Sequence, residues 1–141
     1  MLAVLRIRKL IYQIVILSED ILYTVPQLSK ELGITERAIR FYESKGLVKP
    51  GRAGNTRIFN YKDRARLLII MRAKKLGFSL NDIKTYLDLY DVDPTHTKQS
   101  KNALKAITQR LAQLKDQKKQ ILLTIKELKS LKNDIENSLN H

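Results

Sequence analysis

The chain has 141 residues, in which 27 Lys and Arg outnumber 14 Asp and Glu, giving a formal net charge of +13. This length allows one domain, or one small domain with an appendage. The absence of cysteine excludes a disulfide framework, a thiolate metal site and a cysteine redox switch. A strongly basic chain favours a polyanionic partner, either nucleic acid or an anionic membrane surface. A cysteine-free composition also fits a cytoplasmic protein.

Residues 1–22 form an apolar N-terminal segment with a basic patch. Its longest nearly apolar stretch, Leu10 to Leu17, is much shorter than the ~20 residues that a membrane-spanning helix needs. Ser18-Glu19-Asp20 offers no small-residue cleavage site of the kind that ends a signal peptide. We therefore treat residues 1–22 as an N-terminal extension of unknown role. It is an extra strand or short helix packed on the domain, the product of a start codon placed too far upstream, or a segment with a function of its own.

Two short helices are predicted next, separated by a tight turn. Thr24 is placed to cap the first helix, Gln27 occupies the partner position of a capping box, and Pro26 is tolerated in the first turn. Gly33 can end this helix in a backbone conformation with positive φ. Thr35 can then cap a second helix almost at once. This pattern is typical of a helix-turn-helix.

The second of these helices carries two arginines one turn apart. Arg37 and Arg40 are expected to point outward, while Ile34, Ile39 and Phe41 supply the apolar contacts between the helices. An arginine in this place can bind a guanine edge through two hydrogen bonds, or bind phosphate and only position the helix. The alternative is that both arginines are ordinary solvated surface charges.

A small hairpin is predicted after the second helix, and we call it the wing. Leu47–Pro50 is expected to be extended, Gly51–Asn55 to form a turn, and Arg57–Tyr61 to alternate as a strand. Arg52 and Arg57 flank the turn, where they could reach backbone phosphates beside a groove. A hairpin with a purely structural role is the alternative.

Two further helices are predicted behind the wing. The first runs from Lys62 to Leu76 and ends at Gly77. The second is capped by Ser79 and runs through Leu89. The apolar face of the first is predicted to consist of Leu67, Leu68, Ile70 and Met71.

Several motifs in this region resemble, in order, the DNA-binding domain of the MerR family of bacterial transcriptional regulators. They are Tyr23-Thr24, Ile39-Arg40-Phe41-Tyr42-Glu43, Gly46-Leu47, Arg57 and Gly77-Phe78-Ser79-Leu80. The resemblance implies a winged helix-turn-helix dimer that binds a pseudo-palindromic promoter and distorts it so that RNA polymerase can engage both recognition elements. Carried over by position, the DNA contacts would be Thr24, Arg37, Arg40, Tyr42, Arg52 and Arg57. One departure lies in the wing, where Asn55-Thr56-Arg57 replaces the more usual Gly-Tyr-Arg and an aromatic neighbour is lost.

The C-terminal part is predicted to be one long helix over residues 98–137, reached through a linker over residues 91–97. Its apolar side chains recur in steps of three and four, as in a coiled coil, and Lys118 and Lys132 interrupt the pattern. We call the following set the apolar stripe: Leu104, Ile107, Leu111, Leu114, Ile121, Ile125, Leu128 and Ile135. A stripe of this length predicts a dimerisation helix, although the helix could instead fold back onto its own domain. In the family that the chain resembles, this helix pairs antiparallel with the other subunit.

The sequence offers no catalytic constellation and predicts no cofactor and no metal site. His96 is isolated and is expected to be a solvent-exposed loop residue rather than a ligand. No segment resembles the separate ligand domain that drug-sensing members of the family carry. The regulatory input is therefore either a small-molecule effector of unknown identity held between the subunits, a protein partner, or nothing.

The predicted fold is mainly α, a winged helix-turn-helix over residues 23–90 followed by a long dimerising coiled-coil helix. The favoured function is a homodimeric, sequence-specific DNA-binding transcription regulator in the cytoplasm, with no membrane partner. The first alternative is an architectural protein that bends DNA without a dedicated promoter. A membrane-surface or scaffolding coiled coil is a weaker alternative, and an enzyme is weaker than all three.

Overall fold

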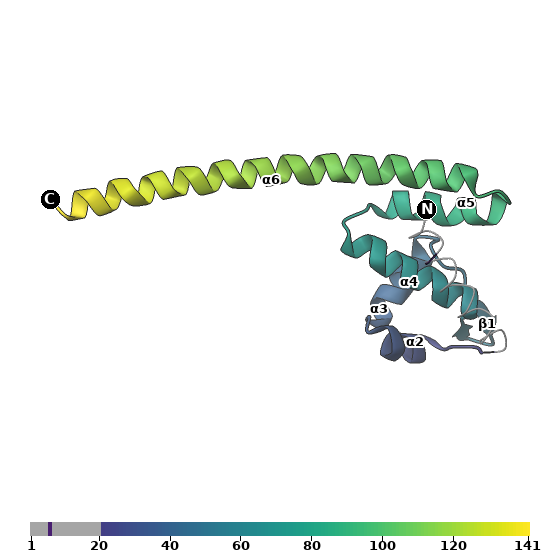
Figure 1. Ribbon diagram of the computed structural model, residues 1–141. Coiled ribbons are helices and arrows are strands. Elements are labelled where there is room, and N and C mark those ends of the chain that lie inside the picture. The colour runs from purple at the N-terminus through teal and green to yellow at the C-terminus, as the bar shows by residue number, and fades with distance from the viewer. Residues whose placement is uncertain (1–5, 7–20) are drawn as a thin grey trace. The chain divides into compact units, whose positions relative to one another are not determined.

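The computed structural model describes Arg6 and residues 21–141, so the expectation for residues 1–22 lies almost entirely outside it. The chain divides into two units, Met1–His96 and Thr97–His141. The described part of the first unit contains four helices and a two-stranded hairpin, and the second unit is a single helix (Figure 1).

The predicted helix-turn-helix is confirmed. Helix α2 spans Val25–Leu32 and α3 spans Glu36–Ser44. Thr24 and Gln27 form the predicted capping box, in which the Thr24 backbone N–H donates to Gln27 Oε1 at 2.8 Å. Gly33 ends α2 at φ 67°, a left-handed conformation that favours glycine. The Thr35 hydroxyl then accepts from the Ala38 backbone N–H at 3.1 Å, which fixes the start of α3.

The wing is present, but the predicted turn over Gly51–Asn55 is wrong in part, because its first three residues form a strand and Leu47–Pro50 lies in none. Strand β1, Gly51–Ala53, pairs antiparallel with β2, Thr56–Ile58, around the two-residue turn Gly54-Asn55. The predicted strand through Tyr61 is therefore wrong, because Asn60 caps the next helix instead. Phe59, just after β2, forms an isolated antiparallel bridge with Tyr23. The two residues exchange two backbone hydrogen bonds of 2.8 Å.

Two helices follow the wing and contact each other. Helix α4 spans Tyr61–Lys75 and α5 spans Leu80–Val92. The predicted end of the second helix at Leu89 is wrong by about one turn, because α5 continues to Val92. It ends there because Pro94 favours an extended backbone at the residue before it, Asp93. Residues 93–96 then connect α5 to the helix that follows.

The hydrophobic core of the first unit draws on α2, α3, α4 and α5 and on the segments before and after the wing. Its fully buried side chains include Leu28 of α2, Ile39 of α3, Leu67 and Ile70 of α4, and Phe59 after the wing. Two predicted contacts are wrong because the side chains are exposed, Leu68 of α4 and Phe41 of α3. At both sites the adjacent residue packs against the core instead, Ile69 in α4 and Tyr42 in α3.

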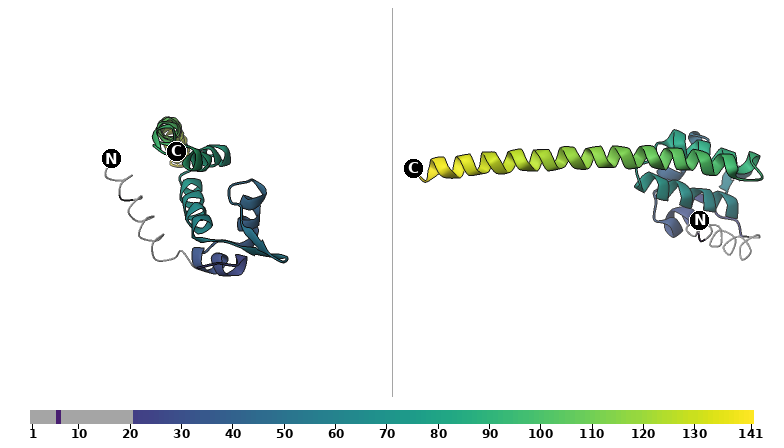
Figure 2. Two further views of the ribbon diagram at one scale, coloured as in Figure 1. Left: turned by 90° about the vertical axis from the view of Figure 1, so that its right-hand side faces the viewer. Right: turned by 45° about the horizontal axis from the view of Figure 1, so that its top comes forward.

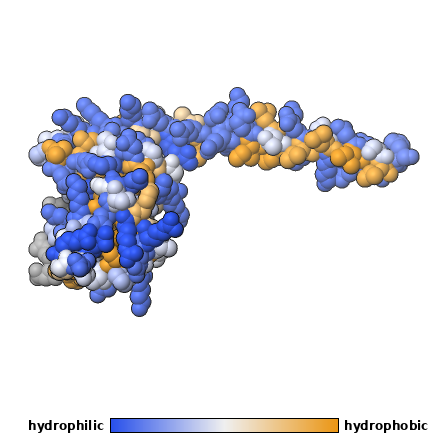
Figure 3. Space-filling model, turned by 180° about the vertical axis from the view of Figure 1, so that it is seen from behind, coloured by the Kyte–Doolittle hydropathy of each residue, from blue (hydrophilic) through white to orange (hydrophobic). Residues whose placement is uncertain are grey.

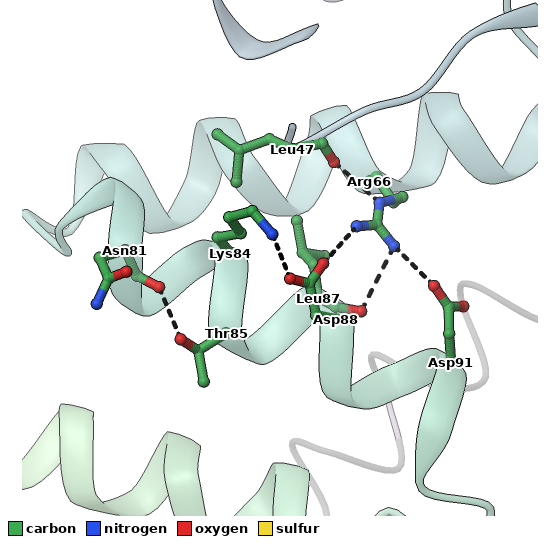
Figure 4. A network of polar contacts seen from close by, with 8 residues as sticks. All are labelled: Leu47, Arg66, Asn81, Lys84, Thr85, Leu87, Asp88 and Asp91. Carbon is green, nitrogen blue, oxygen red and sulfur yellow. Dashed lines mark hydrogen bonds and ion pairs between the residues drawn. The ribbon is translucent and has the colours of Figure 1, made fainter. Parts of the chain in front are cut away.

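Arg66 on α4 ties the segment after α3 to the second half of α5 (Figure 4). Its Nε donates to the carbonyl oxygen of Leu47 at 3.0 Å, and Nη1 donates to that of Leu87 at 3.4 Å. The same guanidinium forms ion pairs with Asp88 at 3.6 Å and Asp91 at 3.3 Å. The bond to Leu47 satisfies the carbonyl oxygen of a buried residue. Arg66 therefore helps to fix the segment that joins α3 to the wing.

Asp63 completes a second capping box with Asn60 at the start of α4, and its side chain is buried. Burial raises the pKa of Asp63 above its ordinary value of 3.8, even though a hydrogen bond from the Asn60 backbone and the charge of Arg66 act in the opposite direction. The folded protein therefore binds this proton more tightly than the unfolded chain. Ionisation of Asp63 lowers the free energy of unfolding as pH rises from about 3.8 through the folded pKa.

Asp63→Asn should remove this penalty, because an amide oxygen can still accept from the Asn60 N–H. We expect the stability of the variant relative to the wild type to rise between pH 3 and pH 7 in urea unfolding experiments. Glu31→Gln, which removes a carboxylate that is not buried, serves as the comparison. A difference between Asp63→Asn and wild type that does not change with pH would contradict this account.

The second unit consists of helix α6, Thr97–Leu139, which confirms the predicted long helix and extends it by two residues beyond residue 137. Figure 2 shows it as one uninterrupted helix. It contains no glycine or proline, and at 1.5 Å per residue its 43 residues span about 65 Å.

Candidate DNA-binding surface

The exposed face of α3 carries both predicted arginines. Ile39 is fully buried, which turns Arg37 and Arg40 on the same helix toward solvent. Arg40 Nη2 pairs with Glu36 Oε2 at 3.0 Å, and both side chains are largely exposed. Exposed pairs of this kind contribute only about 0–1 kcal/mol. Arg40 can therefore leave Glu36 for a base edge or a phosphate at little cost.

The contact between α2 and α3 is reinforced at the turn. The Ser29 hydroxyl donates to the carbonyl oxygen of Ile34 at 2.6 Å. Glu31 on α2 also pairs with Arg64 on α4, where Arg64 Nε lies 2.6 Å from Glu31 Oε1. The Ser29 bond fixes the turn that leads into α3, whereas the Glu31–Arg64 pair joins α2 to α4.

Two predicted DNA contacts have structural roles as well. Thr24 is half-buried, and its hydroxyl lies 3.2 Å from Gln27 Oε1 as part of the capping box. Tyr42 is half-buried against the core, with its ring 5.9 Å from that of Phe41. Phe41 is the exposed aromatic of the pair, at 44% exposure, and Lys45 Nζ lies 5.5 Å from the centre of its ring. Exposed Phe41 therefore belongs to the candidate surface, although the sequence pattern placed it in the core.

The wing arginines share one carboxylate from α3. Arg52 on β1 and Arg57 on β2 lie directly opposite each other in the hairpin register. Arg57 Nε donates to Glu43 Oε2 at 2.5 Å, and Arg52 Nη2 donates to Glu43 Oε1 at 3.5 Å. Sequence reasoning missed the role of Glu43, because no local spacing indicates which arginines its side chain will meet.

The apolar stripe lies exposed along α6. All eight of its side chains are between 43% and 66% exposed. Figure 3 shows apolar residues along this helix among hydrophilic ones. Contiguous apolar surface of this extent marks an interaction site.

The described residues contain no group of His, Cys, Asp and Glu side chains that could hold a metal ion. His96, expected to be solvent-exposed, is half-buried and stacks on Tyr90 with ring centres 5.0 Å apart. Among the described helices none is both long and apolar enough to cross a membrane.

A helix-turn-helix whose second helix exposes two arginines, followed by a two-stranded wing, defines a winged helix-turn-helix DNA-binding protein. Two models of one family match the chain, "MerR HTH family regulatory protein" over residues 23–89 and "MerR, DNA binding" over residues 64–131. The chain belongs to the MerR family of DNA-binding transcription regulators.

Known relatives agree with this assignment. A regulator from Haemophilus influenzae, named a ZntR homolog, is 41% identical over 64 residues, which cover 44% of this chain. The match spans about half of that relative, 47% of its length.

Two solved structures share the fold at 27% sequence identity. One is a transcription regulator from Ralstonia metallidurans in complex with lead(II), with a TM-score of 0.66 over 77% of this chain and 84% of that chain. The other is HiNmlR, described as a MerR family regulator lacking the sensor domain and bound to promoter DNA. Its TM-score is 0.53 over 68% of this chain and 77% of that chain.

Proposed function

We propose that the protein is a homodimeric, sequence-specific transcription regulator that binds a pseudo-palindromic promoter site and distorts it. Residues 23–90 would bind DNA, residues 98–137 would form the dimer, and residues 91–97 would join the two. The observation that carries the proposal is the pair of exposed arginines on α3, held by a helix-turn-helix that ends in a basic wing. A similar structure bound to promoter DNA supports the same reading.

Dimerisation is proposed from the apolar stripe. Burial of a leucine side chain stabilises an assembly by about 1.5–3 kcal/mol, and α6 exposes eight such apolar side chains. A second copy presents the same stripe and can cover it symmetrically. Two copies would place two α3 helices against two half-sites, and so explain a requirement for a pseudo-palindrome.

RNA polymerase is the proposed further partner and the cytoplasm the proposed location, because a regulator of this family acts on promoters. The second candidate function is an architectural DNA-bending protein, which the net charge of +13 also favours.

The two functions are separated by genome-wide recovery of DNA bound to the protein, followed by titration of the best site at two salt concentrations. A regulator should give a few sharp peaks with a two-fold symmetric motif and prefer that motif by roughly a thousandfold or more. Broad recovery without a motif, with affinity that falls steeply with salt, would support the architectural function instead.

Arg40→Ala should weaken binding to the recovered operator by about 1–3 kcal/mol, because a bidentate contact to a base would be lost. Arg37→Ala tests the other arginine in the same way. Fluorescence anisotropy with operator and scrambled duplexes of equal length provides the measurement. Arg72→Ala on α4 removes the same charge from another exposed site and should reduce both affinities equally. If Arg40→Ala also leaves the ratio of the two affinities unchanged, Arg40 does not read a base.

A further inference from the structure

The wing carries two positive charges directly opposite each other, and one carboxylate of α3 pairs with both. Arg52 and Arg57 are paired residues in the antiparallel register, so their side chains project from the same face of the hairpin. Like charges directly opposite each other destabilise a hairpin. Glu43 of α3 accepts hydrogen bonds from both arginines, one at each carboxylate oxygen, and so offsets part of their repulsion.

The two contacts are unequal. Arg57 lies 2.5 Å from Glu43, its side chain is 29% exposed, and its partner is 21% exposed. Arg52 lies 3.5 Å from the same carboxylate and is 50% exposed. Arg57 is therefore held where solvent screens the charges less, whereas Arg52 has a long contact at the surface and can exchange it for another anion.

We propose that Glu43 is a positioning residue that orients the wing against the recognition helix and withholds Arg57 from DNA. Arg52 is then the wing cation that binds a backbone phosphate. This assignment rests on the proposed function and refines it, since the resemblance to the family treats both wing arginines as DNA contacts. Glu43 acts through the arginines and does not itself touch DNA, because a carboxylate and a phosphate repel each other.

The assignment has a consequence for the salt dependence of binding. Each phosphate that a protein cation neutralises adds about 0.9 to the magnitude of the slope of log affinity against log salt concentration. Removing the charge of a residue that binds phosphate lowers that magnitude, and removing the charge of a residue that stays paired with Glu43 leaves it nearly unchanged. The slope therefore distinguishes a phosphate contact from a positioning contact.

The test uses the full chain, the operator recovered from the genome and a scrambled duplex, each titrated over a series of salt concentrations. For Arg52→Gln we expect the slope to fall in magnitude by about 0.9 on both duplexes. For Arg57→Gln we expect an unchanged slope and a lower preference for the operator, because the wing loses its attachment to α3. Equal losses of slope in the two variants would overturn the proposal.

Glu43→Gln should release Arg57 and free both arginines. We expect tighter binding to the scrambled duplex, a slope steeper by about 0.9, and at least a tenfold lower preference for the operator. Glu31→Gln makes the same change in net charge, and also deprives an arginine of its partner, but lies on α2. It should leave both the slope and the preference near the wild-type values.

Unchanged slope and preference in Glu43→Gln would overturn the proposal, as would equal changes in Glu31→Gln. If Glu43→Gln does not fold, judged by circular dichroism, the two arginine variants still decide the question. Failure of the proposed function gives a different result, since the wild type would then bind both duplexes equally well.

Discussion

Replacing both Leu111 and Leu114 with lysine is expected to produce a monomer and to reduce operator affinity by at least a hundredfold. Both side chains belong to the apolar stripe and are about half exposed in the single chain, at 52% and 43%. In a dimer each protomer would lose two buried leucines, each contributing about 1.5–3 kcal/mol. Four lysine charges would also have to be kept hydrated near the interface.

Sedimentation velocity measures the oligomeric state of this double variant, and anisotropy titration measures its affinity for the operator. A matched control replaces Ala112 and Gln113 with lysine, which adds two positive charges to the same turn outside the stripe. The control should remain a dimer and bind the operator at least as well as the wild type. A monomeric double variant with full operator affinity would rule out the requirement for a dimer, and a dimeric one would place the interface elsewhere.

The lysines that interrupt the stripe fit a specific interface better than a general aggregation surface. Lys132 pairs with Glu136 on its own helix at 3.6 Å, so its charge already has a partner at the edge of the stripe. Lys118 lies among other lysines on α6. Charged residues at such positions disfavour incorrect alignments of two helices more than they stabilise the correct one.

Features determined by neighbouring residues in the chain could be predicted from the sequence. The caps at Thr24, Thr35 and Ser79 and the left-handed Gly33 all lie where predicted, because each depends on backbone groups within three or four residues. The long helix was predictable for the same reason, since nothing between residues 97 and 139 breaks it.

Features determined by tertiary contacts could not be predicted in this way. Phe41 and Tyr42 are adjacent aromatics, and only the orientation of α3 on the core decides that Tyr42 is the one that packs. The attachment of Arg66 to the Leu47 carbonyl joins residues 19 positions apart, and that of Arg57 to Glu43 joins residues 14 positions apart. The identity of the exposed cations on the candidate surface was therefore predictable, but their partners were not.

Phe59→Ala is expected to lower the free energy of unfolding of the first unit by about 3–5 kcal/mol, since Phe59 is fully buried and truncation leaves a cavity. Domains are typically stable by about 5–15 kcal/mol, so the loss is a large fraction of the total. Urea unfolding at one fixed protomer concentration provides the measurement, because dimerisation would make the stability depend on concentration. Phe59→Leu, which keeps most of the apolar volume, should cost much less.

Operator binding should fail in Phe59→Ala before the helix of the second unit unfolds. Phe59 exchanges two backbone hydrogen bonds with Tyr23, and these join the end of the wing to the start of α2. Loss of the packed ring therefore loosens the wing and the helix-turn-helix together, whereas the backbone hydrogen bonds of α6 lie within that helix. On heating, anisotropy with the operator should report loss of binding while circular dichroism still reports helix. Coincident loss of both signals would show instead that the two units unfold as one, and a destabilisation below 1 kcal/mol would show that neighbouring side chains fill the cavity.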